Sequence, residues 1–321
     1  MSNLTKKIGF IFPGQGSQAT GMGLDLYNNF DVSKKIFETS NVVLNKKISD
    51  ICFEGPDEEL KKTINAQSAI VTTSIAALSA FLSKCDVKPT VVLGHSLGEY
   101  CAMYAAGVMD FNTTIKAIQK RSELMDEATK STKGTMAAVL GSSIEVIKMC
   151  INEASSLGTV QIANYNDPTQ IVITGETEAV IKASELIKAQ GARKVVPLAV
   201  SGGFHSKLMT SARDGFVDFV KDLELNDAQI PVITNVDAKI TQKAQEFREK
   251  MPNQINSSVM WLQSIKNAVD LGVSTFIEFG SGKILAGLNR KISGEITTYN
   301  VFDTQSLNDT ISALSSELIE A

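Results

Sequence analysis

Histidine is scarce in this chain, which carries only His95 and His205 among its 321 residues. Any chemistry that needs an imidazole base must therefore use one of these two side chains. Cysteine is scarce as well, and the four cysteines are scattered without a CxxC pair. This spacing argues against disulfides and against a cysteine metal site, and it favours reduced thiols. We therefore expect a cytoplasmic protein.

The chain also lacks a long apolar run and an excess of basic residues. Near the N-terminus the apolar run covers only residues 8–12, which is too short for a signal-peptide core or a membrane span. Lys and Arg number 31 against 35 Asp and Glu, for a net charge of −4. This balance gives no reason to expect a nucleic acid or a membrane as a partner.

Strand and helix patterns alternate along most of the chain, which is typical of a parallel α/β sheet. Strands are expected at 7–14 and 89–94, and helices at 24–44, 67–85, 97–107 and 112–130 with Asn112 as N-cap. The pattern returns near the C-terminus, with helices expected at 206–223 and 258–270 and from Gly282, and with strands at 231–235 and 275–280. A last strand and helix complete an α/β-hydrolase-like large domain formed by residues 1–130 and 201–321.

Residues 131–200 follow a different pattern. A strand at 134–141 precedes a helix at 142–156, two strands lie within 158–176 around a turn at 166–168, and a helix at 177–191 leads to a strand at 192–200. The order β-α-β-β-α-β is that of a ferredoxin-like unit. We therefore predict an inserted ferredoxin-like small domain at 131–200.

The sequence GHSLG at residues 94–98 fits the pattern G-x-S-x-G between a strand and a helix. This is the pattern of a nucleophile elbow, in which Ser96 stands on a tight, strained turn. Gly94 and Gly98 carry no Cβ that would clash where the strand approaches the helix. The helix that starts at Leu97 points its free N–H groups at a carbonyl under attack. A simple tight turn is the alternative.

A serine hydroxyl needs a base to take its proton. His95 is adjacent to Ser96, and neighbouring side chains at a sharp turn point in different directions. His205 lies in a Gly-rich segment where the small domain returns to the large one. Elimination therefore favours His205 as the base and leaves His95 packed beside the elbow, although a structural role for either histidine is the plainer alternative.

Five motifs together resemble those of the malonyl-CoA:acyl carrier protein transacylase family, the acyltransferases that load malonyl groups for fatty-acid synthesis. They are FIFPGQGSQ (10–18), GHSLGEY (94–100), KRSELM (120–125), FHS (204–206) and EFGSGKILAGL (278–288). They occur in the family's order across nearly the whole chain, and the inserted small domain is a family trait. The resemblance is far more specific than G-x-S-x-G alone.

The resemblance implies a role for each matching residue. Ser96 would be the acyl nucleophile and His205 its general base. Arg121 would pair with the malonyl carboxylate, although its position on a helix would otherwise suggest a solvated side chain. The backbone N–H groups of Gln15 and Leu97 would form the oxyanion hole. The reaction would use malonyl-CoA and acyl carrier protein, with no metal or redox cofactor.

Three further positions bear on this resemblance. Phe204 precedes the histidine, where related polyketide acyltransferases carry a Phe when they select malonyl over methylmalonyl groups. Met260 stands where the family often has a glutamine, in a segment (257–261) that supplies a main-chain carbonyl to orient the histidine. A main-chain acceptor survives a side-chain change, so the Ser–His pair is expected to hold. Gly202 and Gly203 replace the family's commoner polar residues.

Other functions fit the sequence less well. An esterase or thioesterase would use the same elbow, but Arg121 and the GQGSQ loop argue against it. A non-catalytic module that binds carrier protein is disfavoured because Ser96 and His205 are both intact. GQGSQA (14–19) imitates a dinucleotide fingerprint and GSGK (280–283) a phosphate loop, but Pro13 and Ile284 depart from those patterns.

Overall fold

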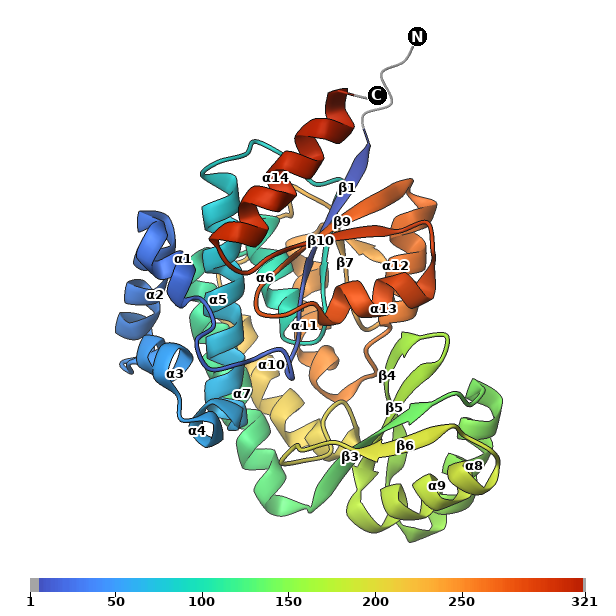
Figure 1. The fold of residues 1–321 in the computed structure, drawn as a ribbon. Helices are drawn as coiled ribbons and strands as arrows, with labels where there is room; N and C mark the ends of the chain where they lie inside the picture. The colour runs from blue at the N-terminus through green and yellow to red at the C-terminus, as the bar shows by residue number, and fades with distance from the viewer. Residues whose placement is uncertain (1–5, 320–321) are drawn as a thin grey trace.

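A six-stranded sheet forms the centre of the larger part of the structure, a computed structural model that describes residues 6–319 (Figure 1). Its strands are β1 (Lys7–Phe12), β2 (Val91–Gly94), β7 (Val232–Ile233), β8 (Ile240–Thr241), β9 (Val273–Phe279) and β10 (Thr297–Val301). They lie in the order β10-β9-β1-β2-β7-β8, and all neighbours are parallel except β7 and β8. The predicted parallel α/β sheet is confirmed, with one antiparallel strand at its edge.

Helices cover both faces of this sheet. They are α1 (Leu24–Asn29), α2 (Asp31–Val43), α3 (Ile48–Glu54), α4 (Asp57–Lys61), α5 (Thr63–Leu82), α6 (Gly98–Ala105), α7 (Phe111–Ser131), α10 (Thr210–Lys221), α11 (Ala244–Asn256), α12 (Trp261–Asp270), α13 (Ile284–Ile292) and α14 (Thr304–Ile319). Alternation along β1 divides the core: Phe10 and Phe12 pack with the helices of one face, and Ile11 packs with α12 and α13 on the other.

Helix α5 is the central helix of the larger core. Among the described residues it is the one helix long and apolar enough to cross a membrane, but nearly all of it is buried inside the protein. Its apolar side chains pack against the sheet and against α2 and α7. The helix is therefore a core element, and most of its polar side chains, Gln67 among them, are buried.

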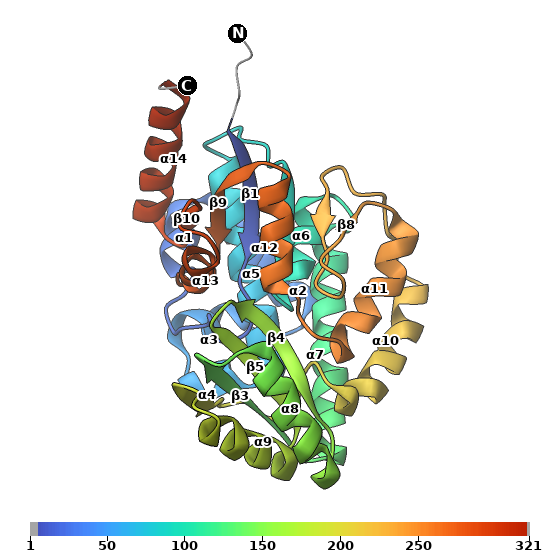
Figure 2. The same cartoon turned by 90° about the vertical axis from the view of Figure 1, so that its right-hand side faces the viewer.

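The second sheet is smaller and wholly antiparallel. Its strands β3 (Gly134–Leu140), β4 (Val160–Asp167), β5 (Gln170–Glu176) and β6 (Lys194–Pro197) lie in the order β4-β5-β3-β6, with α8 (Ile144–Ala154) and α9 (Thr177–Ala189) between them in the chain. This is the strand order of a ferredoxin-like unit, as predicted. Figures 1 and 2 show α8 and α9 on the side of this sheet that faces away from the large sheet. The boundaries at 131 and 200 stay a prediction.

Some elements differ from those predicted. The segment expected as one helix at 24–44 is interrupted at Phe30, which separates α1 from α2. Asn112 is not the N-cap of α7; the cap is Asp110, whose side chain accepts a hydrogen bond from the backbone of Thr113 at 2.7 Å. Helices α3, α4 and α11 were not predicted.

The carboxyl ends of β1 and β2 lie side by side. Phe12 is in register with Gly94, and the backbone N–H of His95 donates to the carbonyl of Phe12 at 2.9 Å. The two segments that follow these strands, 13–18 and 95–98, therefore lie together at the carboxyl end of the large sheet. The small sheet lies beyond this end of the large sheet (Figure 1).

The close approach of β2 to α6 yields a prediction about stability. A Cβ atom on Gly94 would lie 2.0 Å from the carbonyl of Gly98. We expect Gly94→Ala to lower the free energy of unfolding, measured in urea, by about 3 kcal/mol, since backbone atoms must move apart.

Gly287→Ala in α13 is the matched control, because a Cβ there meets no atom within 4 Å. It should leave stability unchanged or raise it by up to about 1 kcal/mol. Equal effects of the two substitutions would contradict the packing argument.

Candidate active site

Ser96 stands on a strained turn between β2 and α6. Its φ is 52°, in the left-handed region that a residue with a side chain rarely adopts. Two hydrogen bonds of the Asn235 side chain hold this turn: its Oδ1 accepts from the backbone N–H of Ser96 at 2.7 Å, and its Nδ2 donates to the carbonyl of Gly94 at 2.7 Å. The local geometry is that of the predicted nucleophile elbow.

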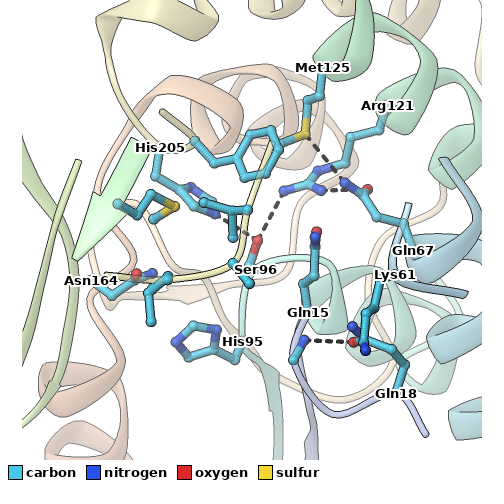
Figure 3. Close-up of a pocket in the computed structure, with 16 residues that line it drawn as sticks. Gln15, Gln18, Lys61, Gln67, His95, Ser96, Arg121, Met125, Asn164 and His205 are labelled. Carbon is cyan, nitrogen blue, oxygen red and sulfur yellow. Dashed lines mark hydrogen bonds between the residues drawn. The ribbon is translucent and has the colours of Figure 1, made fainter. Parts of the chain in front are cut away.

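His205 lies in the segment between β6 and α10, and its ring contacts Ser96. Its Nε2 lies 2.7 Å from the Ser96 Oγ (Figure 3). Its Nδ1 faces two carbonyl oxygens, those of Gln254 at 3.0 Å and Ser257 at 3.1 Å. Because a carbonyl can only accept, Nδ1 carries the ring proton and Nε2 is left to accept a proton from the serine hydroxyl.

The surroundings keep the His205 ring neutral. Burial is the largest cause, and the nearby positive charge of Arg121 adds to it, so the pKa falls from 6.5 to about 3. The two carbonyl bonds to Nδ1 act in the opposite direction but are outweighed. At neutral pH the imidazole is therefore in the form that a general base needs.

Arg121 enters the site from α7 and is 1% exposed. Its Nη1 donates to Gln67 Oε1 at 2.6 Å, and its Nη2 donates to Gln254 Oε1 at 3.0 Å and to the Ser96 Oγ at 3.1 Å. Burial lowers the pKa of this guanidinium, and the negative charge of the buried Glu99 opposes that effect. Within the described residues no carboxylate lies close enough to form an ion pair with it.

A cavity of about 340 Å³ opens onto these three side chains between the two sheets. Its lining comprises Gln15, Gly16, Gln18, Lys61, Gln67, His95, Ser96, Arg121, Met125, Met136, Asn164, Leu198, Ala199, Val200, Phe204 and His205. Figure 3 shows the labelled polar side chains arranged around Ser96. The lining therefore combines a few convergent polar groups with an apolar wall, which is the composition of a small-molecule site.

Gln15, Leu97 and Phe204 lie in the cavity wall or directly beside Ser96. Gln15 and Phe204 line the cavity, and Leu97 is the buried N-cap residue of α6, directly after Ser96. In the described part of the chain, the backbone N–H groups of Gln15 and Leu97 have no hydrogen-bond acceptor. Both groups are therefore free to donate to a substrate oxygen.

His95 does not contact the serine hydroxyl. Its Nε2 pairs with the Asn166 Oδ1 of β4 at 2.9 Å, and its ring lies 5.7 Å from that of Trp261. The structure thus brings Ser96 together with His205 rather than His95. No cluster of three or more possible metal ligands occurs among residues 6–319.

Three further side chains, which were not predicted from the sequence, build the site. Gln254 contacts the whole set: its Oε1 meets Arg121, its Nε2 donates to the carbonyl of Ser96 at 2.8 Å, and its own carbonyl faces His205. Asn235 holds the elbow, and Gln67 holds Arg121. Gln67 is the one with a signal in the sequence, as a long polar side chain on a helix without charged residues that is predicted to be buried.

Comparison with known proteins agrees with this geometry. The model of the acyl transferase domain family matches residues 9–287. A malonyl CoA-acyl carrier protein transacylase from Bacillus subtilis is 42% identical over 312 residues, which are 97% of this chain and 98% of the relative. The chain belongs to the malonyl CoA-acyl carrier protein transacylase family.

Solved structures of this transacylase family are closely similar. The transacylase of Clostridium perfringens is 37% identical, with a TM-score of 0.93 and 98% of each chain covered. A malonyl-transacylase in complex with the acyl-carrier protein of a type II polyketide synthase is 36% identical, with a TM-score of 0.93, covering 97% of this chain and 99% of that one. The two-sheet fold is thus the fold of the transacylase family.

The lowered pKa of His205 predicts a titration that is unusual for a histidine side chain. With only two histidines in the chain, ¹⁵N NMR can follow each imidazole separately. We expect the His205 ring to remain neutral at about pH 5, where a free histidine is charged.

The same shift affects stability. In the unfolded chain His205 binds a proton below about pH 6.5. In the folded chain it remains neutral until the pH falls to about 3. The free energy of unfolding therefore falls as the pH drops through this window, and His205→Gln should reduce that slope. A His205 midpoint near pH 6.5 would contradict both expectations.

Proposed function

We propose that this protein transfers the malonyl group from malonyl-CoA to the phosphopantetheine thiol of acyl carrier protein, in fatty-acid biosynthesis, through a malonyl ester on Ser96. One observation carries the proposal: the Ser96 hydroxyl lies between the neutral Nε2 of His205 at 2.7 Å and the guanidinium of Arg121 at 3.1 Å. The first contact activates a nucleophile, and the second offers a charge for a substrate carboxylate.

In the first half-reaction, His205 Nε2 accepts the proton of the Ser96 hydroxyl while Oγ attacks the thioester carbonyl of malonyl-CoA. The tetrahedral intermediate carries a negative oxygen, for which the free N–H groups of Gln15 and Leu97 are the donors. When the intermediate collapses, the C–S bond breaks and coenzyme A leaves as a thiol with the proton from His205. Ser96 then carries the malonyl ester.

The second half-reaction reverses these roles. The phosphopantetheine thiol of the carrier protein gives its proton to His205 Nε2 and attacks the ester carbonyl of malonyl-Ser96. Collapse breaks the bond to Ser96 Oγ, which takes the proton back from His205. The enzyme is thereby restored, and the malonyl group is a thioester again, so the transfer needs no redox or metal chemistry of its own.

Arg121 gives this site its preference for a carboxylate. Malonyl and acetyl groups differ by one carboxylate, and the buried guanidinium of Arg121 is held by neutral oxygens of Gln67, Gln254 and Ser96, with no ion pair among the described residues. The malonyl carboxylate would supply a counter-charge through a two-pronged hydrogen bond. Phe204 lies in the wall of the same cavity, where its ring leaves less room for an α-methyl group, which supports malonyl over methylmalonyl.

The pathway and the compartment are the finer parts of the proposal. The four free cysteines support a reducing, cytoplasmic location. Transfer to the organism's fatty-acid carrier and to a polyketide carrier, compared side by side, tests the pathway. Faster transfer to the fatty-acid carrier is expected.

The nucleophile and base are tested with labelled malonyl-CoA followed by acid precipitation. Wild-type protein should retain the label, and Ser96→Ala should retain none while melting at an unchanged temperature. His205→Ala should form the malonyl-enzyme at least about 1,000-fold more slowly, because nucleophile and base act as a unit.

His95→Ala is the matched control and should keep most of the rate. The proposal fails if His95→Ala loses acylation while His205→Ala retains it. Rapid release of free malonate by the wild type would point to a hydrolase, and an absence of label would point to a binding module.

Arg121→Ala should change two substrates in opposite senses. Its kcat/KM for malonyl-CoA should fall by about 100- to 1,000-fold, because the buried carboxylate loses its partner. Acetyl-CoA should become a comparatively better donor, because no unpaired charge faces the neutral acyl group. Arg121→Lys should restore only part of the malonyl rate. An equal decrease for both donors would mean that Arg121 does not select the carboxylate.

A further inference from the structure

The backbone at His205 is held in an unfavourable conformation. Its φ is 57°, in the left-handed region, which residues other than glycine uncommonly adopt. Such a conformation persists only where the surrounding structure over-determines it. The contacts of the segment around His205 therefore show which groups orient its imidazole ring toward Ser96.

Two side chains of the small sheet form hydrogen bonds with the backbone of this segment. The Gln161 Nε2 donates to the carbonyl of His205 at 3.3 Å, and its Oε1 accepts from the backbone N–H of Lys207 at 3.2 Å. The Thr174 Oγ1 donates to the carbonyl of Phe204 at 2.8 Å. Three backbone groups within residues 204–207 are thus bound by side chains of β4 and β5.

Gln161 and Thr174 are opposite each other in the antiparallel pairing of these strands. Directly paired residues project from the same face of a sheet, so the two side chains act together on one segment. Thr174 is fully buried, and its hydroxyl has this carbonyl as its acceptor. The pair forms what we call the β4–β5 clamp, meaning Gln161 and Thr174.

Close packing adds to the clamp. A Cβ on Gly203 would lie 2.9 Å from the carbonyl oxygen of Gly175 on β5, and a Cβ on Gly134 of β3 would lie 2.5 Å from the backbone nitrogen of Gly203. The Gly-rich segment thus rests directly on the backbone of the small sheet. The lack of room for a Cβ at this position accounts for Gly203, which stands where the family more often has a polar residue.

Strand β4 also fixes the carbonyl that orients the imidazole. The backbone of Val259 bonds to Ala163 at 2.8 Å and to Tyr165 at 2.9 Å, and the Ser258 hydroxyl donates to the carbonyl of Ile162 at 2.6 Å. Ser257, whose carbonyl faces His205 Nδ1, directly precedes this paired segment. One strand of the small sheet therefore anchors both the backbone of His205 and an acceptor of its ring.

We propose that Gln161 and Thr174 are positioning residues for the transfer reaction, and that the small sheet sets the geometry of the Ser96–His205 pair through them. This inference rests on the proposed role of His205 as general base. It gives the small domain a function in the chemistry itself, in addition to forming one wall of the cavity.

The test uses Gln161→Met, which keeps the length of the side chain but removes both hydrogen bonds, and Thr174→Val, which removes only the hydroxyl. The single-turnover rate of malonyl-enzyme formation at saturating malonyl-CoA should fall by about 10- to 100-fold in Gln161→Met and by about 3- to 10-fold in Thr174→Val. The KM for malonyl-CoA should stay within about twofold of wild type, because neither residue touches the cavity.

Three controls separate positioning from general destabilisation. Thr174→Ser retains the hydroxyl and should restore the rate to within about twofold of wild type. Gln190→Ala, on the exposed end of α9 in the same domain, should leave the rate unchanged. Partial unfolding would lower the amplitude of the single turnover without changing its rate constant.

NMR of the two histidines supplies a readout that does not depend on activity. The protected Nδ1–H signal of His205 should broaden or shift in Gln161→Met, while the Nε2–H signal of His95, which donates to Asn166, stays in place. Wild-type rate constants in both clamp variants, or a rise in KM at constant kcat, would overturn the inference. If His205→Ala itself formed the malonyl-enzyme normally, the proposed function would fail instead, so the two failures are distinguishable.

Discussion

A buried arginine without an acidic partner is the constraint on which the rest of this site depends. Placing a guanidinium where it is 1% exposed is costly unless its N–H groups find acceptors. The fold provides acceptors for the two terminal nitrogens, from Gln67 on α5, Gln254 on α11 and the Ser96 hydroxyl, while Nε finds no partner among the described residues. These acceptors are neutral, and among the described residues no carboxylate forms an ion pair with Arg121, which prepares the cavity for an anionic substrate.

The same charge governs the acid–base chemistry. Together with burial, Arg121 holds the pKa of His205 low, so the imidazole is neutral and ready to accept a proton. Gln254 couples the three groups because it contacts Arg121 and Ser96 through its side chain and His205 through its carbonyl. The proposed nucleophile, the proposed base and the charge proposed to select the substrate are therefore positioned by one connected network rather than independently.

Much of this arrangement could be predicted from local patterns in the sequence. The elbow at Ser96 follows from two glycines between a strand and a helix, and the small sheet follows from its β-α-β-β-α-β order. Helix α11 was missed because its sequence is polar and contains Pro252, which normally ends a helix. Its Gln254 reaches Ser96 across 158 residues of sequence, and no local pattern encodes such a contact. Arg121 was expected in the site only through the resemblance, since a charged helix residue is ordinarily solvated.

A crystal structure of the protein trapped as its malonyl-enzyme tests the central claim most directly. The account predicts an ester on the Ser96 Oγ, with the malonyl carboxylate bound by the guanidinium of Arg121 in a two-pronged hydrogen bond. It also predicts the ester carbonyl oxygen near the backbone N–H groups of Gln15 and Leu97. A malonyl carboxylate that pointed toward solvent or toward Lys61, with Arg121 still bound only to its glutamines, would contradict the account.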